Sequence, residues 1–368
     1  MNIAILGFGV VGKGVYDILE KLDIGIEVRY IFERDMTKVI GLESKVTTDI
    51  NTILNDNSID IVIELMGGLV YAYEVIKKCL QVNKHVVSAN KAVISSHMRE
   101  LTNLAKIHNV QLRYEASVGG GIVVLNPLNT ISKLNHINHI KGIINGTTNF
   151  VLTKFFKSNL SLEKSLNLAM EMGYLETGST DDMDGLDLMR KINILSSISY
   201  HQFIDEKHVF VNKLSDVSSE MLEYVKDQGF LIKYVGESWL SNNEVMIRVE
   251  PVIIDKTDIY SAIDYGENYI EFNGENFEQC AFQGLGAGRY PTAQAVVYDL
   301  FKIKSNILED ALINREDLII NNDLLQFNYL ILDKNNKIYK TDKISLSELL
   351  RLRSNCICYI RIEADINV

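Results

Sequence analysis

The first twelve residues hold the feature that most restricts how this chain can fold. Residues 2–6 (NIAIL) are apolar, which predicts a buried strand. Gly7-Phe-Gly9-Val-Val-Gly12 follows at once, and the apolar residues of 13–22 then recur at helical spacing. Glycines between a strand and a helix permit a tight turn and let backbone N–H groups approach a pyrophosphate at the helix start. The alternative is a tight strand-to-helix turn that binds no ligand.

Strands and helices continue to alternate over the first third of the chain. Apolar stretches predict strands at 28–32, 59–65, 85–88 and 111–114, and helical spacing predicts a helix at 70–82. Such alternation is typical of an α/β fold with a parallel sheet. We therefore expect a Rossmann-type doubly wound nucleotide-binding domain over residues 1–130. A helix at 291–304, beginning at Pro291, is expected to complete it.

The pattern changes from about residue 131. Helices are predicted across 150–172 and near 215–228, and apolar strands at 139–144, 231–236, 245–254 and 269–272. Strands that follow helices favour a mixed sheet, so residues 131–290 should form an α+β domain for substrate binding and dimerisation. Residues 305–368 predict a short α+β appendage without chemistry, with strands at 328–332 and 357–362 around a helix at 345–352.

Composition excludes several classes of function. The net charge of −11 is unsuited to a surface that follows nucleic-acid phosphates. No apolar run approaches the ~20 residues that cross a bilayer, and the apolar N-terminus lacks a basic leader. Four scattered cysteines fit a reducing compartment, and the seven histidines do not reach metal-ligand spacing. We therefore expect a cytoplasmic protein with no nucleic-acid or membrane partner and no transition-metal centre.

The chemistry is expected in residues 173–191 (GYLETGSTDDMDGLDLMRK), where an Arg-Lys pair follows five carboxylates: Glu176, Asp181, Asp182, Asp184 and Asp187. On a helix, Asp187 and Lys191 share one row with Ile194, so this ion pair should face the protein interior. The acids can grip the ammonium group of an amino-acid substrate while Lys191 supplies or removes a proton. The alternative is a solvated helix ion pair worth about 0.3 kcal/mol.

Three further motifs lie where parallel strands are predicted to end. Glu33 can bind a ribose 2′-hydroxyl and Arg34 a 2′-phosphate, so the choice between NAD and NADP stays open. Lys91 follows the strand at 85–88 and is placed near cofactor or substrate, unless it is an ordinary loop lysine. Glu115 precedes three glycines, whose carbonyls together with its carboxylate suit a monovalent or hard cation. The sequence alone favours the other interpretation of these glycines, a flexible crossing between domains.

Eight blocks, in order along the chain, resemble the homoserine dehydrogenase family over residues 1 to 304. They are GFGVVG at 7–12, ELMGG at 64–68, SANKA at 88–92, YEASVGGGI at 114–122, NGTTNF at 145–150, GYLE at 173–176, DGLDLMRK at 184–191, and GLGAG with PTA at 284–293. The resemblance implies reversible NAD(P)H-dependent reduction of L-aspartate 4-semialdehyde to L-homoserine, a step of threonine, methionine and isoleucine biosynthesis. A homodimer is expected, with apolar strands of the second domain shared between subunits.

The resemblance also implies roles for individual residues. Lys191 would transfer the proton, and Lys91 would be a second essential lysine that touches cofactor and substrate. The substrate pocket would comprise Gly173, Glu176, Asp182 and Asp187; the cofactor would meet Phe8, Gly9, Val10, Val11, Arg34, Gly67, Lys91 and Gly288; and sodium would meet the Glu115 side chain and backbone oxygens of Val118, Gly120 and Ile122. Glu33 stands where relatives often carry an apolar residue, whereas Arg34 fits the NADP-reading position of the family.

Two rival functions stay open at the level of the sequence. A Rossmann dehydrogenase for another small amino acid would share the cofactor domain, and the acidic cluster predicts that its substrate carries an ammonium group. A cofactor-binding metabolite sensor would instead bind the nucleotide without oxidising homoserine, despite intact Lys91 and Lys191.

Overall fold

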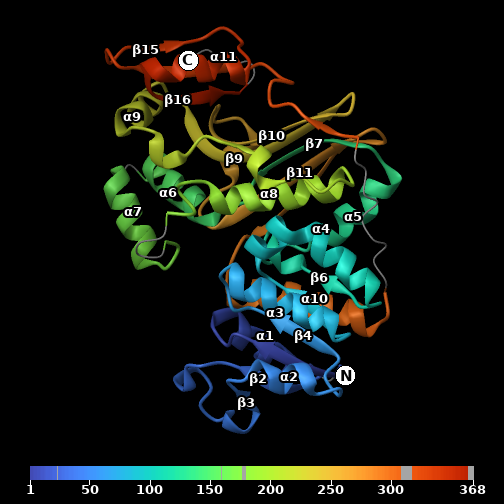
Figure 1. Ribbon diagram of the computed structural model, residues 1–368. Coiled ribbons are helices and arrows are strands. Elements are labelled where there is room, and N and C mark those ends of the chain that lie inside the picture. The colour runs from blue at the N-terminus through green and yellow to red at the C-terminus, as the bar shows by residue number, and fades with distance from the viewer. Residues whose placement is uncertain (23, 159, 176–179, 308–316, 364–368) are drawn as a thin grey trace. The chain divides into compact units, whose positions relative to one another are not determined.

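The computed structural model describes residues 1–363 apart from 23, 159, 176–179 and 308–316 (Figure 1). The chain divides into two compact units, one formed by residues 1–130 with 285–314 and the other by residues 131–284 with 315–368. Among the described helices, none has the length and apolarity that a membrane crossing requires.

A parallel sheet forms the centre of the first unit. Its strand order is β3-β2-β1-β4-β5-β6, and the neighbouring strands run parallel. The bounds are β1 Asn2–Leu6, β2 Glu27–Phe32, β3 Val46–Thr47, β4 Ile61–Glu64, β5 His85–Ser88 and β6 Leu112–Arg113. This order is that of a doubly wound dinucleotide-binding fold, and it changes direction between β1 and β4. Ligands of such sheets bind beyond the carboxyl ends of the strands at this point, which is where the glycine turn after β1 lies.

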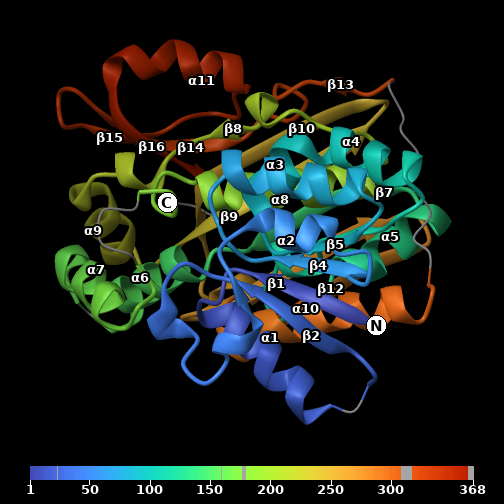
Figure 2. The same ribbon diagram turned by 60° about the horizontal axis from the view of Figure 1, so that its bottom comes forward.

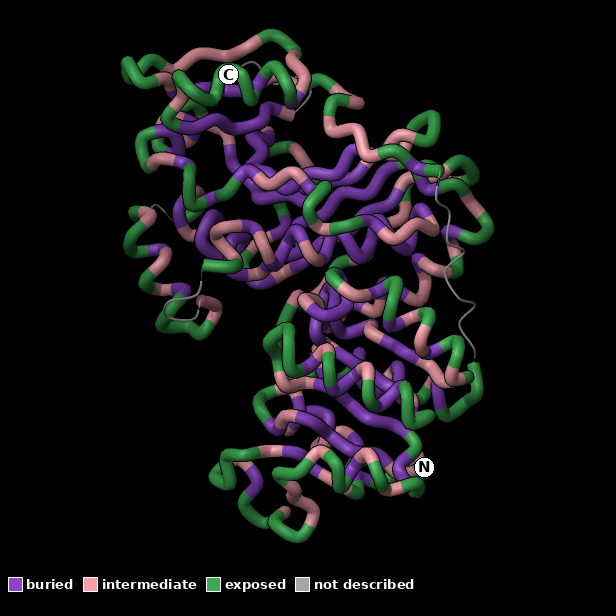
Figure 3. The backbone as a smooth tube through the Cα atoms, viewed as in Figure 1, coloured by how far each residue is buried: buried purple, intermediate pink, exposed green. Residues whose placement is uncertain are grey.

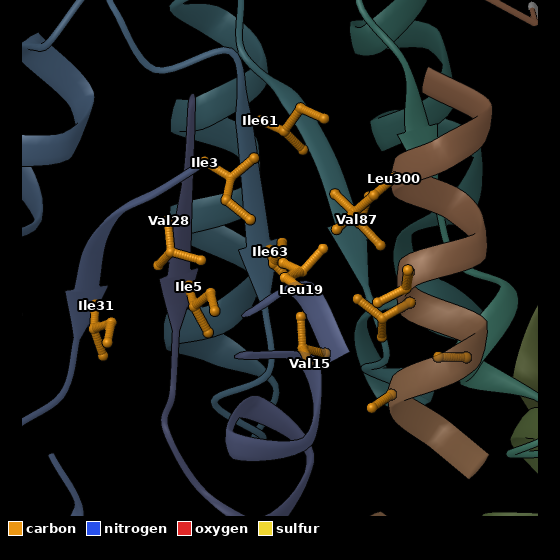
Figure 4. Packing of buried hydrophobic residues seen from close by; sticks show 14 of the residues in the cluster. Ile3, Ile5, Val15, Leu19, Val28, Ile31, Ile61, Ile63, Val87 and Leu300 are labelled. Carbon is orange, nitrogen blue, oxygen red and sulfur yellow. The ribbon is translucent and has the colours of Figure 1, made fainter. Parts of the chain in front are cut away.

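Helices cover both faces of this sheet, with α1 and α10 on one face and α2, α3 and α4 on the other (Figure 2). The bounds are α1 Val10–Lys21, α2 Ile50–Asn55, α3 Val70–Gln81, α4 Lys91–Ile107 and α10 Arg289–Lys304. The core joins β1 and β4 to α1 and α10 through Ile3, Ile5, Ile61, Ile63, Val15, Leu19 and Leu300 (Figure 4). Each such side chain contributes about 1.5–3 kcal/mol when fully buried, so apolar packing binds the late helix α10 to the first strand.

A mixed sheet forms the centre of the second unit, in the order β12-β11-β7-β9-β10-β16-β14-β15. The bounds are β7 Ile137–Ile143, β9 Leu231–Ser241, β10 Glu244–Ile254, β11 Glu267–Gly274, β12 Phe277–Leu285, β14 Asn328–Asp333, β15 Ile338–Lys340 and β16 Cys356–Ile362. Its helices are α6 Gly146–Lys157, α7 Leu162–Glu171, α8 Leu186–Ser199, α9 Ser219–Asp227 and α11 Leu346–Leu352; α5 Leu125–Leu134 lies at the junction of the two units. The strands β7, β9 and β10 are almost wholly buried (Figure 3). A parallel-sheet unit followed by a mixed-sheet unit confirms the predicted fold class.

The described part of the C-terminal segment continues this second sheet. Strand β16 runs parallel to β10 in the register Val252–Arg361 and Ile253–Ile362, and β14 runs antiparallel to β16. Leu346 and Leu349 of α11 pack against Tyr329 of β14. The region that the sequence analysis describes as an appendage is therefore hydrogen-bonded into the sheet of the second unit.

Buried charges also hold this segment in place. The guanidinium of Arg361 on β16 forms an ion pair with Glu237 on β9, and its Nε lies 3.2 Å from Oε1 of Glu250 on β10. All three side chains are buried. Burial opposes ionisation of Glu237, but the charge of Arg361 and a hydrogen bond with His139 hold the pKa of Glu237 well below its ordinary value. The two carboxylates therefore share the charge of Arg361, and Glu250 also lies 4.0 Å from the guanidinium of Arg248.

Replacing Arg361 by methionine should lower the free energy of unfolding by about 3–5 kcal/mol, because it removes the buried cation that Glu237 and Glu250 share. The matched control is Arg353→Ala in the same segment. Arg353 is 59% exposed and lies 3.9 Å from Asp216, so its removal should cost at most about 1 kcal/mol. Urea unfolding followed by circular dichroism measures both changes. Equal losses in the two variants would contradict a stabilising role for the buried cation.

Candidate functional site

The three glycines of the first turn serve different physical purposes. Gly7 has a φ of +92°, and a Cβ there would lie 2.7 Å from the carbonyl oxygen of Leu65. A Cβ at Gly12 would overlap the carbonyl oxygen of Gly7, so the helix can lie this close to the strand only without a side chain. Nothing lies within 4 Å of a Cβ built on Gly9, which leaves its backbone open to a ligand. These are the roles of the three glycines in a dinucleotide-binding turn.

The helix that follows presents its N-terminus at this turn. Gly9 is the N-cap residue of α1, and no side chain of the described residues caps the helix there. Its first N–H groups are therefore available to an anion. Phe8 is buried in the core, whereas Val10 is exposed. The predicted cofactor contacts Phe8, Gly9, Val10 and Val11 thus lie on one turn, where backbone groups rather than side chains can meet a pyrophosphate.

Glu33 and Arg34, which follow the end of β2, have different surroundings. Oε2 of Glu33 accepts a hydrogen bond from the N–H of Phe8 at 3.0 Å, and Oε1 accepts two more backbone N–H groups at 2.9 and 3.1 Å. Burial opposes ionisation, but these bonds hold the pKa of Glu33 below its ordinary value. Arg34 is exposed, with its guanidinium carbon 5.9 Å from the ring centre of Tyr71. Glu33 therefore holds the glycine turn, and Arg34 presents a cation outside it.

A buried carboxylate organises the loops after β4 and β5. Glu64 is fully buried and accepts hydrogen bonds from the N–H of Met66 and the hydroxyl of Ser88, both at 2.8 Å. Burial raises its pKa. The sequence analysis did not single out Glu64, although an acid at the end of an apolar strand is a signal that it could have used.

Asn90 links the same two loops and places Lys91. Its side-chain amide donates to the carbonyl oxygen of Gly68 at 2.7 Å, and its Oδ1 caps α4, whose first residue is Lys91. Gly67 and Gly68 both have a φ of +74° and nothing within 4 Å of a Cβ. The structure thus brings the loop of Gly67 and the helix start at Lys91 to one edge of the sheet. Asn90 is a second residue that the sequence analysis missed.

Two glycine-rich turns of the first unit pack against each other. The N–H of Gly121 donates to the carbonyl oxygen of Leu285 at 3.0 Å, and a Cβ on Gly120 would overlap the carbonyl of Gly286. Gly288, the N-cap residue of α10, has a φ of +129°, which side chains rarely tolerate. Glycine is needed here for close contact between backbones rather than for flexibility.

Glu115 is a buried acid with several backbone partners. Its Oε1 accepts the N–H groups of Val124 and Leu125 at 2.6 and 2.7 Å, and its Oε2 accepts that of Asn126 at 2.9 Å. Burial raises its pKa, and these bonds counteract that rise. Within the described ranges, no three His, Cys, Asp or Glu side chains are grouped to hold a metal ion. Any cation here would depend on Glu115 and on the backbone oxygens of Val118, Gly120 and Ile122.

A buried ion pair is the centre of the candidate site in the second unit. Nζ of Lys191 lies 2.8 Å from Oδ2 of Asp187 on α8, and the two side chains are 11% and 6% exposed. The same Nζ donates to the carbonyl oxygen of Ile144, at 2.7 Å, where β7 has just ended. The pair faces the interior of the unit, as the helical row indicated, and is not a solvated surface pair.

The other acids of this stretch do not all gather around the lysine. Asp181 lies 3.4 Å from Arg190, on the other side of the helix. Asp184 accepts a hydrogen bond from the Ser215 hydroxyl at 2.6 Å, and this bond lowers its pKa. Glu176 lies outside the described residues.

Asp182 joins the ion pair through Asn145, a residue that appears in the sequence analysis only within the family block NGTTNF, with no role of its own. Nδ2 of Asn145 lies 2.6 Å from Oδ1 of Asp182 and 2.8 Å from Oδ2 of Asp187. Burial, and then the charge of Asp187, raises the pKa of Asp182. The signals for Asn145 in the sequence were its place directly after a buried strand and its place at the start of the block NGTTNF.

Gly173 is connected to this group through its neighbour. The hydroxyl of Thr147 donates its hydrogen to the carbonyl oxygen of Tyr174 at 2.7 Å, and it lies close enough to Asp182 to lower the pKa of that acid. Gly173 has a φ of +75° and nothing within 4 Å of a Cβ. The structure therefore groups Asp182 and Asp187 around the amide of Asn145 beside Lys191, and it ties Gly173 to them only through the neighbouring Tyr174.

Comparisons with known proteins agree with these two units. Residues 7–115 match the sequence profile of the homoserine dehydrogenase NAD-binding domain, and residues 124–301 match that of homoserine dehydrogenase. Homoserine dehydrogenase of Helicobacter pylori is 33% identical over 311 residues, and that of Synechocystis is 35% identical over 316; each alignment covers 82% of this chain and 73% of the relative.

Solved structures give the same result. The crystal structure of a homoserine dehydrogenase from Thiobacillus denitrificans superposes with a TM-score of 0.89 at 25% identity, covering 99% of this chain and 98% of that one. Homoserine dehydrogenase of S. aureus superposes with a TM-score of 0.79 at 28% identity, covering 99% of both chains. The protein therefore belongs to the homoserine dehydrogenase family, which consists of NAD(P)-dependent oxidoreductases of amino-acid biosynthesis.

Proposed function

We propose that Lys191 transfers the proton when this enzyme interconverts L-aspartate 4-semialdehyde and L-homoserine. The observation that supports this most directly is the buried amine held between Asp187 and the carbonyl of Ile144. Residues 1–130 with the helix at 291–304 would bind the cofactor, and residues 131–290 the substrate. Phe8, Gly9, Val10, Val11, Arg34, Gly67, Lys91 and Gly288 are the proposed cofactor contacts.

The charges around Lys191 suit this chemistry. A bound nicotinamide supplies or accepts the hydride. During reduction, negative charge develops on the aldehyde oxygen, and the ammonium of Lys191 can stabilise that charge and donate a proton. In the reverse direction the neutral amine removes the hydroxyl proton. Asp187 orients Nζ, and Asp182, which is only partly buried, can hold the α-ammonium of the substrate with Glu176 and the backbone at Gly173. Lys91 would be the second essential lysine.

Replacing Lys191 by alanine should lower kcat for homoserine oxidation by about 10²–10⁴-fold, because the proton-transferring group is gone. The affinity for NADP(H), measured by fluorescence titration, should not change. Arg190→Ala is the matched control, since Arg190 immediately precedes Lys191 and pairs with Asp181 instead. This variant should keep near-normal turnover. Activity retained in the Lys191 variant would remove this lysine from the catalytic role.

We propose that NADP is the preferred cofactor. The carboxylate of Glu33 already accepts three backbone N–H groups, so it is committed to holding the turn rather than being available to a ribose diol. Arg34 is exposed, and its guanidinium lies near the face of Tyr71. A guanidinium in this position suits the two negative charges of a 2′-phosphate.

Arg34→Ala should lower kcat/KM for NADPH by about tenfold or more, because the binding free energy of one charge-assisted hydrogen bond is lost. The kcat/KM for NADH should stay nearly unchanged. Steady-state rates with both cofactors measure the ratio. The matched control is Arg29→Ala, which removes an exposed arginine on β2, the strand that precedes Arg34. An equal loss with NADPH and NADH would contradict 2′-phosphate binding by Arg34.

We also propose that Glu115 and the backbone oxygens of Val118, Gly120 and Ile122 hold a sodium ion. Three of the four proposed ligands are backbone carbonyl oxygens, which hard cations accept; the Glu115 carboxylate already accepts three backbone N–H groups and would have to exchange one of them for the cation. Exchanging sodium for tetramethylammonium at constant ionic strength should then lower activity, and added sodium should restore it. Equal rates in the two salts would argue against the site.

A homodimer that shares strands of the second unit is proposed as the working assembly. Strand β12 lies at the end of the strand order, so its outer edge can accept a strand of a second subunit. The cysteines Cys79, Cys280, Cys356 and Cys358 are unpaired, which is consistent with a reducing cytoplasm.

A further inference from the structure

We propose that Asn145 is a positioning residue of this site: one side-chain amide holds Asp182 and Asp187 side by side, so that two acids and Lys191 face the substrate as one group. The inference rests on the proposed function, because it concerns the acids assigned to the substrate ammonium and to the lysine. It adds a residue to which the sequence analysis gave no role.

The orientation of the Asn145 amide is set by its own helix. Its Oδ1 accepts the N–H and the hydroxyl of Thr148, both at 2.8 Å. The oxygen is thus turned to the start of α6, and the nitrogen must face the other way. Nδ2 carries two hydrogens, and it has two acceptors within bonding distance, one from Asp182 at 2.6 Å and one from Asp187 at 2.8 Å. The amide is fully used, with one hydrogen for each acid.

A neutral donor is the group that this arrangement needs. Two carboxylates that share one donor atom repel each other, and the repulsion favours proton uptake by one of them. Lys191 compensates Asp187 directly, at 2.8 Å, whereas Asp182 accepts the amide of Asn145 at 2.6 Å. The amide stabilises both anions without adding a positive charge, so the net negative charge is kept for a substrate ammonium.

The same short stretch of backbone holds the lysine. Ile144 accepts the hydrogen bond of Lys191 through its carbonyl oxygen, at 2.7 Å, and Asn145, the next residue, binds the two acids. The side-chain amide of Asn268 on β11 also donates to the carbonyl of Ile144, at 3.3 Å. The end of β7 therefore sets the spacing between the cation and both anions, since consecutive backbone positions cannot move independently.

The test is Asn145→Asp, which keeps nearly the same shape and caps a helix as well as asparagine does. It replaces the shared donor by a third carboxylate. At alkaline pH, kcat/KM for homoserine should fall by about 100-fold, the loss expected when reacting groups are displaced by about an ångström. The loss should shrink as the pH is lowered, because a protonated carboxyl group can again donate. The affinity for NADP(H) should match that of the parent.

A second variant measures the acids without turnover. Asn145→Ser retains a capping oxygen but removes the amide, so NMR titration of aspartate carboxyl carbons should show the pKa of the acidic pair raised relative to the parent. Ser161→Ala, which removes the cap of α7, should leave kinetics and carboxyl titration unchanged and shows what the loss of a cap does by itself.

Two results would overturn the inference. One is parental kcat/KM at every pH in Asn145→Asp, together with an unchanged carboxyl titration in Asn145→Ser. The other is a loss of cofactor affinity as large as the loss of turnover, which would point to general misfolding. If instead the parent protein fails to oxidise homoserine while the carboxyl titration still shifts in Asn145→Ser, the proposed function fails and the positioning role stands.

Discussion

The buried ion pair of Lys191 and Asp187 is the interaction on which the second unit depends. A charged amine removed from water is tolerated only where an opposite charge and hydrogen-bond acceptors surround it. Here the opposite charge comes from the same helix, and the acceptor is the carbonyl of Ile144 at the end of β7. The amine meets both partners only when α8 packs on the sheet. The environment of the lysine therefore depends on the packing of the whole unit.

Polar groups at the carboxyl ends of strands fix the following loops within each of the two units. Glu33 after β2, Glu64 at the end of β4, Asn90 after β5, Glu115 after β6 and Asn145 after β7 all bond to neighbouring backbone N–H groups. Buried backbone groups at these positions leave the sheet ladder and need new partners. The side chains accept hydrogen bonds from these backbone groups and so fix the loops. The acids among them therefore hold the backbone in place.

Most elements were predictable because their apolar periodicity is local. Helix α4 (Lys91–Ile107) was not predicted, since serines and charged residues dilute its narrow apolar stripe. Strand β12 (Phe277–Leu285) was not predicted either, because it lies at the end of the strand order with neither face fully buried and so lacks an alternating apolar pattern. The glycine turn, by contrast, was predicted from about a dozen residues at the start of the chain.

The sequence by itself determined that Asp187 and Lys191 share a face, because spacing on a helix sets the direction of its side chains. Only the tertiary structure decided which other acid meets them. Asp181 and Asp182 are neighbours in a turn, yet one pairs with Arg190 and the other joins Asp187 through Asn145, which lies 42 residues before Asp187. In a turn, no regular spacing directs side chains, so their partners follow from the packing of distant segments.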